Sequence, residues 1–206
     1  MAITFNKPII IAIDGGPLSG KTSSFEYLKN TFTHSPIDGV TFLFSDEAAT
    51  KLFEENPDRC GGTIDFQFDV MKLQIKDIEK AYRTAESTDN QVILLCDRTL
   101  MSSIGVYLSK RYNTLFDFKR ILQVYDAVFY FDSAVSLLAD TKAGNAHRRE
   151  SMDEIKALSQ ITRKTLEAHP SFFEIPVFND IRAKYDYVQS KIINFINNTS
   201  AKSEVA

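Results

Sequence analysis

A glycine-rich segment near the N-terminus has the residue types and spacing that bind a nucleoside triphosphate. Residues Gly15 to Thr22 match the pattern G-x-x-x-x-G-K-[ST] at every fixed position. The glycines let the backbone curl until successive N–H groups converge on phosphate oxygens, Lys21 brings a positive charge to the β- and γ-phosphates, and the Thr22 hydroxyl is a natural magnesium ligand. A strand-like run before the segment and a helical pattern after it argue against a chance match. We expect ATP, with GTP as the alternative, to bind with Mg²⁺ at Gly15, Gly16, Pro17, Leu18, Ser19, Gly20, Lys21, Thr22 and Ser23.

An acidic and a basic residue follow another strand-like run. Asp97 and Arg98 come directly after the apolar run Val92 to Cys96. In a parallel sheet of this kind that strand adjoins the one carrying the glycine-rich segment, so the Asp97 carboxylate would face the metal and the phosphates. We expect Asp97 to be an outer-shell magnesium partner or a base. If the bound nucleotide transfers a phosphate, we expect Arg98 to lie close to that phosphate or to the molecule that accepts it. The alternative is a surface ion pair at the end of a strand.

Alternating strand and helix patterns must position these residues. Short apolar runs predict five strands, at residues 9–13, 40–44, 92–96, 127–131 and 172–178. Pro176 interrupts the last run, which suits an edge strand. Helical patterns lie between the runs, and this alternation predicts right-handed crossovers and a parallel sheet with helices on both faces. We expect a three-layer α/β/α fold with a five-stranded parallel sheet, in one domain over residues 1–197, and a disordered tail over residues 198–206.

The helical patterns also predict which side chains are buried. One long helix has an apolar stripe at three- and four-residue spacing, formed by Ile64, Phe68, Met71, Ile75, Ile78 and Tyr82. Phe68 is therefore expected in the core, whereas Phe66 lies on another side of the helix and is a candidate for an acceptor pocket. A capping box at Ser151 to Glu154 opens a later helix, which runs to about Ala168. The histidines lie beside turn signals and are expected to be exposed: His34, His147 and His169.

Composition narrows the range of partners. The formal net charge of −3 offers no basic field to attract nucleic acid, and no apolar run approaches the roughly 18 residues that span a bilayer. Cys60 and Cys96 are too far apart in sequence for a metal-binding knuckle, and nothing suggests a disulfide framework. The N-terminal residues lack the features of a signal peptide. We expect a cytoplasmic protein whose partner is a small molecule, with neither nucleic acid nor membrane as a partner.

The size of the chain and the order of its motifs resemble those of small P-loop kinases of nucleosides and nucleotides. The sequence resembles the NadR-like AAA domain family, whose relatives include the thymidylate and deoxynucleoside kinases. Four blocks carry the resemblance: Ile13 to Pro17, Ser45 to Ala49, Cys96 to Thr99 with Gly105 to Tyr107 after it, and more weakly His147 to Ser151. No Asn-Lys-x-Asp segment of a switch GTPase is present, nor the long acidic strand of a motor ATPase.

The resemblance implies roles for three more residues. In deoxynucleoside kinases a glutamate in a place similar to that of Glu47 accepts a proton from the substrate hydroxyl, so Glu47 is expected to be a general base or to orient the substrate. The alternative is that Glu47 only complements the dipole of the helix it opens, or pairs with Lys51. Arg148 and Arg149 resemble a small lid that closes over phosphates, with at least one of them functional.

The resemblance therefore favours a kinase that transfers the γ-phosphate of ATP to a small ribosyl acceptor, such as a nucleoside or nucleotide. Two alternatives use the same phosphate-binding loop. One is a nucleotide-responsive binding or regulatory module with little turnover, and the other is a plain NTPase that directs water at the phosphate.

Replacing Lys21 tests the phosphate site for all three candidate functions: the kinase, the regulatory module and the NTPase. We expect Lys21→Ala to abolish nucleotide binding or turnover, because the variant loses the full charge that faces the β- and γ-phosphates. Titration of the variant with ATP at millimolar magnesium, beside the parent protein, measures this loss. Unchanged affinity would remove the glycine-rich segment from the site.

Overall fold

A five-stranded sheet forms the centre of the protein. The computed structural model describes residues 7–16, 19–58, 63–102, 118–132 and 152–203. The strands are β1 (Ile9–Gly15), β2 (Val40–Ser45), β3 (Gln91–Asp97), β4 (Ala127–Phe131) and β5 (Phe172–Ile175). They pair in parallel in the order β2-β3-β1-β4-β5. The predicted parallel sheet is confirmed, and β5 lies at its edge with Pro176 just beyond the strand.

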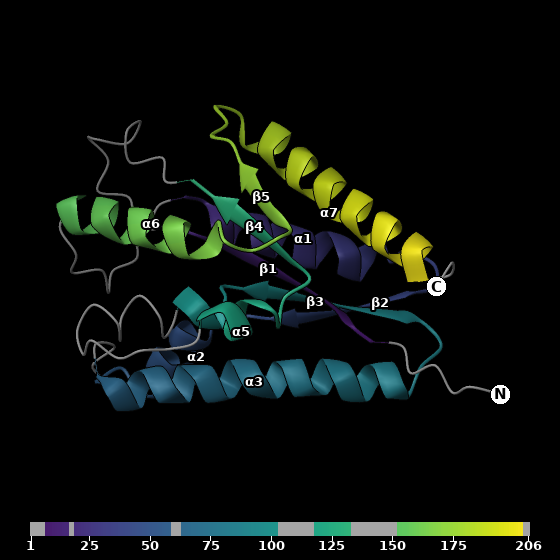
Figure 1. Ribbon diagram of the computed structural model, residues 1–206, viewed down its shortest axis with the longest axis horizontal. Coiled ribbons are helices and arrows are strands. Elements are labelled where there is room, and N and C mark those ends of the chain that lie inside the picture. Colours follow the sequence, from purple (N-terminus) through teal and green to yellow (C-terminus); the bar gives the residue numbers. More distant parts are fainter. Residues whose placement is uncertain (1–6, 17–18, 59–62, 103–117, 133–151, 204–206) are drawn as a thin grey trace.

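Helices cover both faces of the sheet. The helices are α1 (Lys21–His34), α2 (Ala48–Glu55), α3 (Ile64–Glu86), α5 (Phe118–Leu122), α6 (Met152–Leu166) and α7 (Ile181–Ser203), as Figure 1 shows. Side chains alternate along β1, so Ile10 and Ala12 pack with α3, α5 and α6, while Ile9, Ile11 and Ile13 pack with α1 and α7. These two cores make the predicted three layers. None of the described helices is long and apolar enough to cross a membrane.

The carboxyl ends of the strands meet at one edge of the sheet, and the candidate site residues lie there. β1 ends at Gly15, at the start of the phosphate-binding loop, and α1 begins at Lys21. β3 ends at Asp97, and Glu47 is the N-cap of α2, two residues after β2. Because β3 pairs with β1, the parallel arrangement brings the Asp97 segment beside the loop, as the sequence predicts.

The long helix α3 is rotated relative to the predicted stripe. Phe68, which we expected in the core, is 40% exposed, and Ile75 and Tyr82 are exposed to a similar extent. Phe66, the pocket candidate, is instead 1% exposed and packs against Phe53 of α2 at a ring-centroid distance of 4.7 Å. The buried face of α3 consists of Phe66, Gln67, Val70, Gln74, Ala81 and Ala85. Ile64, Met71 and Ile78 of the predicted stripe are partly buried against the core, so the stripe overlaps the buried face but is displaced from it. The displacement arises because small and amide side chains form much of the buried face.

Two further predictions are wrong. The final helix continues to Ser203, so residues 198–203 are helical and not a disordered tail. The buried side chains Val188, Ile192 and Ile196 hold this helix against the core, and no glycine or proline interrupts the polar residues that follow. His169 is 5% exposed because its ring bridges the carbonyl of Tyr125 and the amide of Ser171. Ser151, His147 and the predicted lid lie outside the described residues.

The contact between Gly15 and β4 leaves no room for a side chain. A Cβ on Gly15 would lie 2.2 Å from the carbonyl oxygen of Phe131, and Gly15 has a φ of +154°. We expect Gly15→Ala to destabilise the fold by about 3 kcal/mol or more, because backbone atoms must move apart. Gly39→Ala is the control: Gly39 has a φ of +71° with no atom within 4 Å of the added Cβ, so its cost should stay near 1 kcal/mol. Denaturant unfolding of both variants checks the difference, and equal losses would contradict it.

Candidate functional site at the carboxyl edge of the sheet

The phosphate-binding loop leads from β1 into the first turn of α1. Gly20 precedes the helix with a φ of +74° and makes no side-chain cap, so the first amides of α1 remain available to a ligand. Lys21 is 4% exposed, and burial together with the nearby charge of Arg98 lowers its pKa to about 8. Thr22 and Ser23 are exposed at the same helix terminus. Pro17 and Leu18 lie outside the described residues.

A buried carboxylate on β1 ties this loop to the turn that follows β3. Asp14 is fully buried and accepts hydrogen bonds from the amide of Gly15, the amide and hydroxyl of Thr99, and the hydroxyl of Ser102, at 2.6–2.9 Å. We call these residues the Asp14 network. The sequence patterns predicted no role for Asp14, Thr99 or Ser102, whereas Gly15 was expected in the phosphate-binding loop. The available signal was an aspartate directly after the strand-like run 9–13, where a buried carboxylate requires several polar partners.

The Asp14 network holds Arg98 in an unusual conformation. Arg98 has a φ of +84°, and it is the non-glycine residue with positive φ in the part of the chain that the structure describes. Its amide donates to the carbonyl of Ile13 at 2.9 Å, and Thr99 directly after it is held by Asp14. A left-handed arginine is strained, so its surroundings must fix it on both sides. The result is a fixed backbone position from which the Arg98 side chain extends.

The Arg98 side chain points to Glu47. The Nε of Arg98 donates to Oε1 of Glu47 in an ion pair, and the Thr50 hydroxyl donates to the other carboxylate oxygen at 2.8 Å. Burial alone would raise the pKa of Glu47, but the charges of Arg98 and Lys21, with these hydrogen bonds, lower it to about 2. Lys51 pairs with Asp46 at 3.5 Å, so the alternative Glu47–Lys51 pair does not form.

Asp97 has a different environment from Glu47. It is 2% exposed, and its Oδ1 has no hydrogen-bond partner among the described residues. Burial raises its pKa to about 7, against the opposing effect of Lys21 and with a further increase from Glu47. The alternative prediction, in which Asp97 and Arg98 form a surface ion pair, therefore does not describe the buried Asp97. A buried oxygen without a partner is suited to a metal-bound water or to a proton.

The structure thus brings together Lys21, Glu47, Asp97 and Arg98, whose charges act on one another. Thr22 and Asp97 supply oxygen atoms, which Mg²⁺ prefers, and magnesium in phosphate sites takes its other ligands from water and phosphate. Among the described residues, no group of three or more His, Cys, Asp or Glu side chains is placed to hold a metal ion. Arg148 and Arg149 lie outside the described residues and stay predictions.

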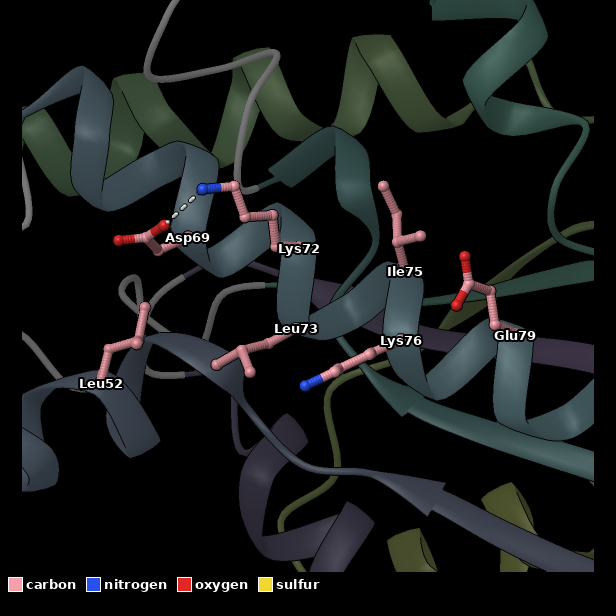
Figure 2. A pocket seen from close by; sticks show the side chains of 7 residues that line it. All are labelled: Leu52, Asp69, Lys72, Leu73, Ile75, Lys76 and Glu79. Atoms are coloured by element: carbon pink, nitrogen blue, oxygen red, sulfur yellow. Dashed lines mark hydrogen bonds and ion pairs between the residues drawn. The ribbon is translucent and has the colours of Figure 1, made fainter.

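A hollow of about 470 Å³ lies elsewhere, beside α2 and α3. Figure 2 shows its lining: Leu52, Asp69, Lys72, Leu73, Ile75, Lys76 and Glu79. None of these belongs to the group around Lys21, and Lys72 is paired with Asp69 within the lining. We therefore do not assign the acceptor to this hollow.

One oxygen of the Asp97 carboxylate is buried without a hydrogen-bond partner among the described residues, so we expect Asp97 to lower the stability of the folded protein when it is ionised. Because its folded pKa of about 7 exceeds the unfolded value of 3.8, the folded protein loses stability as the pH rises between these values. We expect Asp97→Asn to stabilise the nucleotide-free protein by about 1–2 kcal/mol at pH 8, and to give no gain at pH 4.

Thermal or denaturant unfolding at both pH values measures this effect. Asp126→Asn is the matched control, because Asp126 accepts a β1 amide at the opposite end of the strand and pairs with Lys7. That variant should lose stability at pH 8. A loss in Asp97→Asn as well would contradict the assignment of an unpartnered carboxylate.

Comparison with known proteins agrees with the fold. A family model described as an AAA domain matches residues 10–184. No curated protein matches the sequence. A solved thymidylate kinase from Ehrlichia chaffeensis is similar over 90% of this chain and 98% of that chain, with a TM-score of 0.53 and 14% identity, and at this identity the likeness shows the fold alone. Because the family model spans most of the chain, including the phosphate-binding loop and the Asp97 turn, the protein belongs to this AAA domain family of P-loop nucleotide-binding proteins.

Proposed function

We propose that the protein is an ATP-dependent kinase that transfers the γ-phosphate to the hydroxyl of a small ribosyl compound, of nucleoside or nucleotide type. The observation that carries this proposal is the charged group around the loop, in which the buried Lys21 and Asp97 lie within the electrostatic influence of the partly buried pair of Arg98 and Glu47. A phosphoryl transfer needs alignment and positive charge more than covalent help from the protein. The fold shared with a thymidylate kinase adds support by analogy.

Each residue has a defined part in this transfer. The loop amides and Lys21 would hold the β- and γ-phosphates, and Thr22 and Asp97 would hold a magnesium ion, which would neutralise phosphate charge. Arg98 stabilises the charge on the phosphoryl group as its bond to the leaving oxygen breaks. The acceptor oxygen forms the new bond to phosphorus and ADP leaves. Arg148 or Arg149 would close over the phosphates and exclude water.

The proton of the acceptor hydroxyl must also be taken up. Glu47 is a weak base while it is paired with Arg98, because that pair holds its pKa near 2. When Arg98 turns toward the transferring phosphate, Glu47 loses this partner and becomes more basic, so it can orient the hydroxyl and accept its proton. The Glu47–Arg98 pair therefore keeps the base inactive until the phosphate is in place.

An acceptor screen tests the proposal. The full chain is incubated with ATP and Mg²⁺, and ADP release is measured with nucleosides, nucleotides or nicotinamide riboside, using Lys21→Ala as the background. A kinase consumes ATP only when an acceptor is added. Consumption without any acceptor would identify an NTPase, and tight binding with no turnover would identify a regulatory module.

Glu47→Gln tests the base. We expect transfer to the acceptor to fall by about 10²-fold or more while ATP affinity stays unchanged, because glutamine cannot take the proton. Glu54→Gln is the control, since Glu54 is exposed on the same helix α2. Single-turnover rates and a separate ATP titration give the two measurements. Equal transfer rates in the parent and in Glu47→Gln would remove Glu47 from the reaction.

A further inference from the structure

A lysine on the last helix contacts the phosphate-binding loop from outside. Lys184 is in the first turn of α7, where its amide bonds to the carbonyl of Asp180 at 3.2 Å. Its Nζ donates to the carbonyl oxygen of Ser19 at 2.6 Å and lies 4.9 Å from the ring centroid of Phe131. The lysine therefore joins α7, the loop and the end of β4.

Neighbouring contacts fix the position of this lysine. Tyr185 stacks on Tyr27 of α1 with ring centroids 4.5 Å apart, and the Tyr27 hydroxyl bonds to Gln189 at 3.3 Å. These contacts dock the start of α7 on α1, the helix that the loop leads into. The ammonium group thus has a defined place and is not free to sample solvent.

The charge of Lys184 has no carboxylate partner in the part of the chain that the structure describes. The side chain is half-buried, and burial is the cause that lowers its pKa. No ion pair between described residues includes Lys184. A lysine carries three N–H donors, and the Ser19 carbonyl uses one of them. The structure thus holds an uncompensated positive charge against the loop that is to receive phosphates.

The bond to Ser19 sets the direction of the next amide. In a trans peptide the C=O and the N–H point to opposite sides of the same plane. Holding the Ser19 carbonyl toward Lys184 therefore turns the Gly20 N–H to the side away from Lys184. A glycine at position 20 permits this contact for two reasons. Its φ of +74° is a conformation that other residues rarely adopt, and a Cβ there would lie only 2.8 Å from the Lys184 Nζ. Ser19 is 4% exposed, and its hydroxyl has no partner among the described residues, so it too is free for a ligand.

We propose that Lys184 is a positioning residue for nucleotide binding, which holds the Ser19 carbonyl outward so that the Gly20 amide and the Ser19 hydroxyl face the phosphates. The role is indirect, through the peptide between Ser19 and Gly20, and the ammonium charge adds to the positive potential of the loop. This inference rests on the nucleotide-binding part of the proposed function and does not require that phosphate be transferred.

Variants of two lysines on α7 test the inference. Lys191 also lies over an aromatic ring of its own helix, 5.3 Å from the Tyr187 centroid, but it is exposed on α7 without a bond to the loop. Lys184→Met should bind ATP–Mg²⁺ about 10-fold more weakly than the parent, Lys184→Arg should stay within about 3-fold, and Lys191→Met should be unchanged. Lys184→Gln replaces the methionine variant if that chain does not fold.

A second ligand separates positioning of the loop from contact with the base or ribose. Inorganic tripolyphosphate should lose affinity for Lys184→Met by the same factor as ATP, because the loop amide contacts phosphate only. Melting without nucleotide should shift no more in Lys184→Met than in Lys191→Met.

Three results would overturn the inference. They are parent-like ATP affinity in Lys184→Met, an equal loss in Lys191→Met, or a loss for ATP alone with tripolyphosphate unaffected. Failure of the parent protein to bind any purine triphosphate would overturn the proposed function and the inference together. Binding by the parent without phosphate transfer would overturn the kinase and leave the role of Lys184 intact.

Discussion

The buried carboxylate of Asp14 is the constraint on which the rest of the site depends. A carboxylate buried in the central strand of a sheet is shielded from water, so the protein must surround it with hydrogen-bond donors. The Asp14 network provides these donors from the phosphate-binding loop and from the turn after β3. The same bonds that satisfy the carboxylate fix the distance between the loop and Arg98. Stability and alignment of the site therefore have one cause.

The charged side chains around this network differ in how fully they are paired. Among the described residues, Glu47 is paired with Arg98, whereas Asp97 has a carboxylate oxygen without a hydrogen-bond partner and Lys184 has no ion-pair partner. A fold selected for stability alone would satisfy Asp97 and Lys184 as well. The unsatisfied groups lie at the edge of the sheet where a triphosphate with its metal would add charges of both signs, so the ligand completes what the protein leaves open.

The fold could be predicted from sequence because its signals are local. Runs of β-branched residues, the glycine-lysine pattern and Pro176 each act within a few residues, and together they indicate the sheet, the loop and the edge strand. Asp97 was singled out by its place at the end of a strand, and Glu47 by the resemblance to deoxynucleoside kinases; the roles of both residues stay predictions. The orientation of α3 could not be predicted in this way, because Phe66 is buried by Phe53 from another helix and Phe68 is exposed despite its hydrophobic side chain. Asp14, Thr99 and Lys184 likewise act through partners 85 or more residues away along the chain, which a linear pattern does not reveal.

The strand order has a consequence for how the protein is made. β1 is the first strand of the chain, yet its neighbours in the sheet are β3 and β4, so Ile11 pairs with Leu95 on one side and with Ala127 on the other. A growing chain on the ribosome therefore exposes the apolar strand β1 without β3 until residue 97 has emerged, and without β4 until residue 131 has emerged. During that interval the exposed strand edge is open to misassociation, which gives chaperones a defined period in which to protect it.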